Sequence, residues 1–212
     1  RRWTTSPTQG TSTNVLATPL VADLDGDGFA DVVFVTFIGT ATTSAGRLRA
    51  ISGRDGQEMF TVTNAAHALT GRANLALGNI DGDANPEIVA VQQNGRLIAF
   101  EHDGAFKWLS EPLSIAFDFG GPAIADLDGI GLPEIVIGRK AFRADGTLLW
   151  TAPGTNGGGN RSAPFATVVD LDLDGTPEVL VGDAVYSNTG LLLRESPTLP
   201  DGQTAVANFD SD

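Results

Sequence analysis

Residues 23–31 read DLDGDGFAD, and the same nine-residue pattern returns three times further along the chain. The later copies are NIDGDANPE at 79–87, DLDGIGLPE at 126–134 and DLDLDGTPE at 170–178, so that their starts are 56, 47 and 44 residues apart. A partial copy covers residues 208–212. A repeat period of this length indicates a protein built from repeated supersecondary units, so the fold follows from what one unit contains.

Short apolar runs flank every copy of the pattern. They lie at 20–22 and 32–35, 75–77 and 88–91, 123–125 and 135–137, and 168–169 and 179–181. Short runs rich in β-branched residues and bounded by Gly, Pro and Asp are typical of buried strands. Each acidic segment is therefore expected to be a loop that joins two strands.

A second turn follows each of these strand pairs. It ends in Gly, and four positions later Phe60, Trp108 and Trp150 stand in the first three copies, with Arg194 in the fourth. Turn residues between apolar runs favour a β-hairpin, so one repeat holds four strands in about 45 residues, the size of a propeller blade. We predict an all-β fold, a β-propeller of four-stranded antiparallel blades. Residues 1–212 would form one propeller domain or a fragment of one, with residues 1–6 and 208–212 belonging to adjacent or closing blades.

The composition excludes several classes of function. The chain has 26 Asp and Glu against 13 Lys and Arg, and a net charge of −13 repels nucleic acids and anionic membranes. Cysteine is absent, which excludes disulfides and thiolate metal sites. No stretch approaches the ~20 apolar residues of a membrane span. We therefore expect neither a nucleic-acid partner nor a membrane span.

The four loops contain 14 of the 26 acidic residues. In the first loop, carboxylates stand at positions 1, 3, 5 and 9, where alternate residues of a tight loop can converge on one point. Converged carboxylates repel one another unless a cation lies between them, and oxygen ligands without His or Cys favour Ca²⁺ or Mg²⁺. We predict about four Ca²⁺ sites. Because the flanks are strands and the closing acid is at position 9 instead of 12, an EF-hand is excluded.

The four loops are not equivalent. The first and fourth carry four carboxylates, whereas the second has the neutral amide oxygen of Asn79 at position 1 and a further amide oxygen from Asn85 at position 7. The third has Ile130 at position 5, so we expect it to bind Ca²⁺ most weakly or to use a water molecule there. Asp-Gly turns also occur without metal, because Asp caps its own backbone. That interpretation stays open for any single loop, whereas four copies in register favour Ca²⁺.

The loops and their period resemble the FG-GAP repeats, also called VCBS-type repeats, which build the calcium-binding β-propeller of integrin α subunits and of many bacterial surface proteins. Phe119-Gly120-Gly121-Pro122 resembles the segment that names the family, and the resemblance spans residues 18–195. It implies that positions 1, 3, 5 and 9 and a carbonyl at position 7 hold Ca²⁺. The implied ligands are Asp23, Asp25, Asp27, Phe29 and Asp31; Asn79, Asp81, Asp83, Asn85 and Glu87; Asp126, Asp128, Leu132 and Glu134; and Asp170, Asp172, Asp174, Thr176 and Glu178.

The sequence contains no G-x-S-x-G, H-E-x-x-H or Walker motif, and His67 and His102 lie in different repeats. We expect no catalytic residues and no enzymatic activity. The expected function is that of a binding or adhesion module, extracellular or at the cell surface, with structural Ca²⁺, a protein or glycan partner, and an export signal outside this chain. The alternatives are the propeller portion of a polysaccharide-acting enzyme or lectin, with a site in residues 36–44 and 153–161, and a purely architectural repeat.

Overall fold

The computed structural model describes residues 8, 10–39, 45–114, 119–154, 165–196, 198 and 204–207. This part of the chain is all-β, with one 3₁₀ turn, η1 (Ala65–His67), and no α-helix. No helix among these residues has the length and apolar character that a bilayer span requires. The expected strand at 1–6 and the partial repeat at 208–212 lie outside the described residues.

Four antiparallel sheets follow one another along the chain, each built from four strands in chain order. Sheet 1 contains β1 (Leu20–Ala22), β2 (Asp31–Thr36), β3 (Ala45–Ile51) and β4 (Glu58–Thr61), and β5 (Leu69–Thr70) also pairs with β3. Sheet 2 contains β6 (Ala76–Gly78), β7 (Glu87–Val91), β8 (Arg96–Phe100) and β9 (Phe106–Pro112). Sheet 3 contains β10 (Ala123–Ala125), β11 (Glu134–Ile137), β12 (Lys140–Phe142) and β13 (Leu148–Thr151). Sheet 4 contains β14 (Ala166–Val169), β15 (Glu178–Val181), β16 (Ala184–Tyr186) and β17 (Leu192–Glu195). The predicted unit of four antiparallel strands is therefore confirmed in all four copies.

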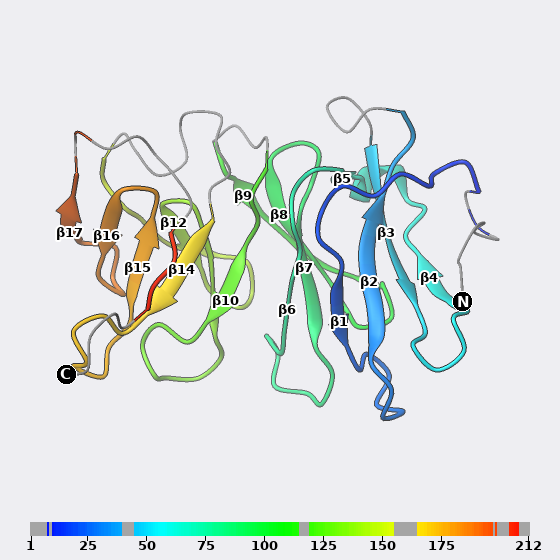
Figure 1. Cartoon of the computed structure of the whole chain (residues 1–212), viewed down its shortest axis with the longest axis horizontal. Helices are drawn as coiled ribbons and strands as arrows, with labels where there is room; N and C mark the ends of the chain where they lie inside the picture. The colour runs from blue at the N-terminus through cyan, green and yellow to red at the C-terminus, as the bar shows by residue number, and fades with distance from the viewer. Residues whose placement is uncertain are drawn as a thin grey trace.

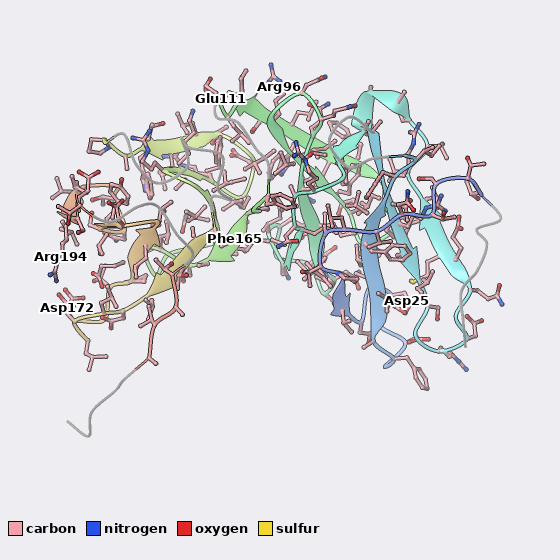
Figure 2. The ribbon with its side chains drawn as sticks, turned by 45° about the horizontal axis from the view of Figure 1, so that its top comes forward. Asp25, Arg96, Glu111, Phe165, Asp172 and Arg194 are labelled. Atoms are coloured by element: carbon pink, nitrogen blue, oxygen red, sulfur yellow. The ribbon has the colours of Figure 1, made fainter. Side chains whose placement is uncertain are left out.

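The sheets stand side by side, from sheet 1 near the N-terminus to sheet 4 near the C-terminus (Figure 1). Their first strands contact one another in the order β1, β6, β10 and β14. Each acidic loop joins the first strand of its sheet to the second, and all four loops lie along the lower edge in Figure 1. Figure 2 shows Asp25 and Asp172 at this edge and Arg96 and Glu111 at the opposite one.

The core consists of apolar layers between neighbouring sheets. Ile88 and Ala90 of β7 pack in a cluster with sheet 1, whereas Val89 and Val91 pack in a second cluster with sheet 3. Successive side chains of a strand point to opposite faces, so a strand covered on both faces is apolar at every position. This burial explains why the runs beside the loops are continuous and do not alternate with polar residues.

Position 2 of the first three loops anchors the loop to these layers. Leu24, Ile80 and Leu127 are at most 2% exposed and pack in the three successive inter-sheet clusters. Leu171, at the same position in sheet 4, is 42% exposed. The first three loops are thus held by apolar burial of the side chain at position 2.

A second contact repeats between neighbouring sheets. The aromatic residue of one sheet packs against the turn glycine of the next, so that a Cβ added to the glycine would meet the ring at 2.5–2.7 Å. The pairs are Phe60 with Gly104, Trp108 with Gly146, and Trp150 with Gly190. This contact accounts for the periodic aromatic residues in the sequence.

Candidate metal centres

The carboxylate at position 9 is the buried end of every loop. It belongs to the first residue of the second strand, and one of its oxygens accepts a hydrogen bond from the backbone N–H at position 2. The four bonds are Leu24 N to Asp31 Oδ2 at 3.0 Å, Ile80 N to Glu87 Oε2 at 2.7 Å, Leu127 N to Glu134 Oε2 at 2.9 Å, and Leu171 N to Glu178 Oε2 at 2.8 Å. All four side chains are buried. The loop is therefore closed across its base in the same way in each copy.

The side chain at position 1 organises the tip of the loop. Asp23 Oδ1 accepts from Gly26 N at 2.8 Å, and Asp23 Oδ2 accepts from Gly28 N at 2.9 Å. Asp170 Oδ2 likewise accepts from Gly175 N at 2.9 Å. These bonds are the backbone caps expected of an Asp-Gly turn, and they fold the chain around a common centre.

Three carboxylates converge in each loop, with one oxygen from each lying within 4.8 Å of the others. The groups are Asp23, Asp25 and Asp27; Asp81, Asp83 and Glu87; Asp126, Asp128 and Glu134; and Asp170, Asp172 and Glu178. A backbone cap needs only one oxygen for each N–H, whereas mutual approach of three negative charges is unfavourable without a cation. Each group could therefore hold a cation.

The surroundings of Glu87 show whether the second loop suits a hard cation such as Ca²⁺. The residue is fully buried, and its Oε1 has no hydrogen-bond donor among the described residues. Burial raises the pKa of Glu87 and of Glu134, because a carboxylate removed from water loses its solvation. A buried carboxylate oxygen that faces two further carboxylates suits a divalent ion with oxygen ligands.

Two of the predicted carboxylate ligands, Asp31 and Asp174, lie outside the converging groups. Asp31 has a shorter side chain than the Glu of the other copies, and its Oδ1 accepts from Gly53 N at 3.0 Å. Asp174 Oδ1 accepts from Thr176 N at 2.8 Å. Asn79 Oδ1 accepts from Gly82 N at 2.6 Å, which is the position-1 role of Asp23. The carbonyls of Phe29, Asn85, Leu132 and Thr176 and the amide of Asn85 stay predictions as ligands.

Two basic side chains beside the loops were not foreseen from the sequence. Lys107 Nζ lies 2.7 Å from Asp81 Oδ2 and 2.7 Å from Glu101 Oε1. The hydrogen bond from Lys107 lowers the pKa of Asp81. Arg54 lies 3.6 Å from Asp27 Oδ2 and also stacks over the ring of Phe29. The sequence does distinguish Lys107, because the residue before the periodic aromatic position is charged only in the second repeat.

No family model matches this chain, and no curated protein matches it. Among solved structures, it is similar to the V. cholerae biofilm matrix protein Bap1, with 29% sequence identity over 91% of this chain and a TM-score of 0.76. It is also similar in fold to the exotype rhamnogalacturonan lyase YesX, with 21% identity over 86% of this chain and a TM-score of 0.63. The matches cover 32% of Bap1 and 38% of YesX, so this chain spans about a third of each protein.

Proposed function

We propose that this chain is a calcium-binding β-propeller module of the FG-GAP or VCBS type, which acts outside the cell in binding or adhesion and is not itself an enzyme. The observation that carries the proposal is the convergence of three carboxylates in each of four equivalent loops. Four consecutive antiparallel sheets with adjacent first strands support the propeller arrangement. The likeness to a biofilm matrix protein supports an extracellular adhesive role, with a protein or glycan as the partner.

In this proposal Ca²⁺ is structural. An ion bound only by the folded loop stabilises the fold by mass action, by about 0.6–1.8 kcal/mol per site when its concentration is two- to twentyfold above Kd. Oxygen-only sites of extracellular modules typically have Kd values of about 10⁻⁴–10⁻³ M. Such sites fill at the calcium concentration outside cells, and the loops then fix the edge at which neighbouring sheets meet.

The test is thermal unfolding of the whole chain in about 2 mM CaCl₂ and in excess EGTA, with a site count from calorimetric titration. We expect EGTA to lower the Tm by about 10 °C or more, since several sites contribute. Asp25→Asn should lower the Tm in calcium, whereas Asp103→Asn, an exposed turn residue outside the loops, should not. An identical melt with and without EGTA would contradict the proposal.

The fold likeness to a rhamnogalacturonan lyase is the observation that favours the alternative, a polysaccharide-acting module. Of the segments expected to hold such a site, residues 40–44 and 155–161 lie outside the described residues. A screen for cleavage of pectins and other acidic glycans tests this alternative. Product formation that is lost on boiling would overturn the non-enzymatic proposal.

A further inference from the structure

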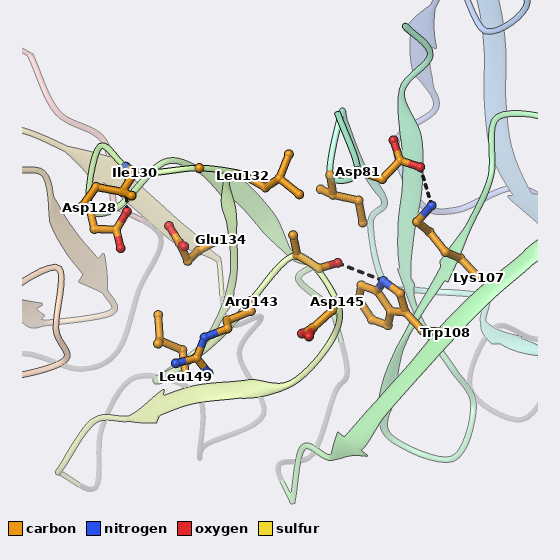
Figure 3. Close-up of a pocket in the computed structure, with 13 residues that line it drawn as sticks. Asp81, Lys107, Trp108, Asp128, Ile130, Leu132, Glu134, Arg143, Asp145 and Leu149 are labelled. Atoms are coloured by element: carbon orange, nitrogen blue, oxygen red, sulfur yellow. Dashed lines mark hydrogen bonds and ion pairs between the residues drawn. The ribbon is translucent and has the colours of Figure 1, made fainter. Parts of the chain in front are cut away.

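A cavity of about 720 Å³ opens between sheets 2 and 3, beside the second and third acidic loops (Figure 3). Trp108 and Leu149 form part of its wall, and Ile130 and Leu132 of the third loop face it from the other side. Cavities of this size accommodate small ligands or single side chains of a partner.

A small residue, Ala144, lines the cavity at a turn position that holds Asn188 in sheet 4. In the turn of sheet 3, Trp108 Nε1 donates to the carbonyl of Ala144 at 3.0 Å, and in sheet 4 Trp150 Nε1 donates to the carbonyl of Asn188 at 2.9 Å. The Asn188 side chain also donates to Leu127 O at 3.0 Å and lines a smaller cavity of about 270 Å³. Alanine cannot make the corresponding bond, so the space beside Ala144 is left open.

The third loop departs from the repeat at the same place. Ile130 stands at position 5, where the other copies have Asp27, Asp83 and Asp174, and it is 75% exposed. Leu132 stands at position 7, is 40% exposed, and reaches the Gly82 of the neighbouring loop. Ile130 replaces the carboxylate that the other copies share, and together with Leu132 it makes this side of the cavity wall apolar.

The rim of the cavity is acidic. Asp81, Asp128, Glu134 and Asp145 outnumber the bases Lys107 and Arg143 in its lining, and Lys107 is already paired with Asp81 and Glu101. Asp145 accepts hydrogen bonds from the backbone and the hydroxyl of Thr147, and these bonds lower its pKa and keep it ionised. Asp145 belongs to none of the converging carboxylate groups, so its charge persists when calcium is bound.

We propose that this cavity binds an aliphatic or aromatic side chain carried by a lysine- or arginine-rich segment of a partner protein. The aliphatic part of the wall suits an apolar side chain, because burial of apolar surface there is favourable. The acidic side chains of the lining, among them Asp145, complement a basic segment. Four bound Ca²⁺ ions would change the net charge from −13 to −5, so we expect the basic segment to bind more tightly in EGTA than in calcium. The inference rests on the proposed role as a binding module, but it does not require calcium.

The experiment uses the whole ¹⁵N-labelled chain and three capped peptides, Lys-Lys-Leu-Lys-Lys, Lys-Lys-Ser-Lys-Lys and Glu-Glu-Leu-Glu-Glu, in calcium and in EGTA. We expect the leucine-containing basic peptide to shift the amide signals of Ile130 and Leu132 and the indole signal of Trp108. The serine peptide should bind at least about tenfold more weakly, and the acidic peptide should produce no shifts.

Ala144→Asn introduces the side chain that Asn188 places in the smaller cavity between sheets 3 and 4. We expect it to weaken peptide binding about tenfold, because it narrows the cavity. Ala105→Asn, at an exposed turn position of sheet 2, is the matched control and should bind like the parent. Leu132→Thr, which copies Thr176 of the fourth loop, should also weaken binding and serves as a second variant if Ala144→Asn unfolds.

Equal binding of the leucine and serine peptides, unchanged binding by both cavity variants, or shifts at another surface would overturn the inference. Shifts of the cavity signals by oligogalacturonide instead of the peptide would overturn it in favour of a glycan. A failure here is separate from a failure of the proposed function. If the proposed function is wrong, EGTA will not change the Tm. If only the cavity inference is wrong, EGTA will lower the Tm but the peptide will not shift the NMR signals of the cavity.

Discussion

At the scale of single residues, position 4 of the acidic loop requires a left-handed backbone. Gly26, Gly82 and Gly129 have φ values of 73°, 87° and 75° at this position, and Leu173 has 62° in the fourth loop. The left-handed region costs a residue with a Cβ about 1–2 kcal/mol, and glycine is free of this cost. The Leu173 side chain is 86% exposed, so its packing contributes little stability to offset this backbone strain.

We predict that Leu173→Gly raises the free energy of unfolding by about 0.5–1 kcal/mol, which is the relieved strain less the greater flexibility of glycine in the unfolded chain. The matched control is Leu191→Gly. Leu191 is 63% exposed but has no left-handed backbone, so its replacement should be neutral or destabilising. Urea unfolding of the three proteins measures both effects. Equal changes in the two variants would mean that position 4 is not strained.

The ligand set could be predicted from the sequence only in part. Alternate acids in a nine-residue repeat predict that carboxylates gather in each loop, and positions 1 and 3 do lie together in the first, third and fourth copies. The spacing does not determine the side-chain direction at the loop ends. Both carboxylate oxygens of Asp31 accept backbone hydrogen bonds, one from Leu24 N and one from Gly53 N, and its short side chain stays at the base of the loop. Gly53 is 22 residues away in the sequence, so the repeat pattern does not predict this bond. Lys107 likewise reaches Asp81 only through the fold.

At the scale of elements, the aromatic–glycine contact connects each sheet to the next. Gly146 has φ of 82°, and a Cβ there would lie 2.5 Å from Trp108 Cε3. Gly95, in the β7–β8 turn, has φ of 73° and open space around it. The two glycines therefore differ in packing but share the left-handed backbone.

We predict that Gly95→Ala lowers the free energy of unfolding by about 1–2 kcal/mol through backbone strain alone. Gly146→Ala should lower it by about 1–3 kcal/mol more, because the added methyl displaces the indole between sheets 2 and 3. Denaturant unfolding gives both values, and the indole NMR signal of Trp108 reports the displacement. If both variants lost the same stability, the contact between neighbouring sheets would be loose.

The third loop is the element with an incomplete ligand set, since Ile130 replaces the position-5 carboxylate. We predict that Ile130→Asp increases the calcium affinity of this loop about tenfold or more, because it adds a charged oxygen ligand. Ile130→Ser, which removes the aliphatic side chain without adding charge, is the control and should change the affinity much less. Calorimetric calcium titration measures the change. Equal affinities for the Asp and Ser variants would place position 5 outside the ligand shell.

Strands beside the loops could be predicted because their apolar runs are local, but other elements depend on distant partners. β5 has two residues and forms by pairing with β3. Nothing in the sequence of β5 predicts this pairing. Arg49 is fully buried in β3, where its guanidinium meets Glu58 at 3.3 Å and the hydroxyl of Thr36 at 2.7 Å. A buried arginine needs partners from three segments, and a repeat pattern carries no information about them.

At the scale of the whole molecule, negative charge is concentrated along one edge of the row of sheets. The loops there hold 14 of the 26 acidic residues, whereas the chain as a whole has 13 bases. Apolar layers between the sheets hold this edge together against the repulsion between carboxylates. The stability of the fold should therefore depend on ionic strength whenever the loops lack divalent ions.

We predict that raising NaCl from about 0.02 M to about 0.5 M in EGTA raises the Tm, because the screening length falls from roughly 20 Å to roughly 4 Å and the repulsion within the acidic edge weakens. In saturating calcium the same change of salt should have a much smaller effect, since bound ions already neutralise the loops. Melting curves at low and high NaCl, each in EGTA and in saturating calcium, distinguish screening of the repulsion by salt from its neutralisation by bound calcium. A salt response of equal size with and without calcium would mean that the repulsion arises elsewhere on the surface, and that the loops do not bind divalent ions as a set.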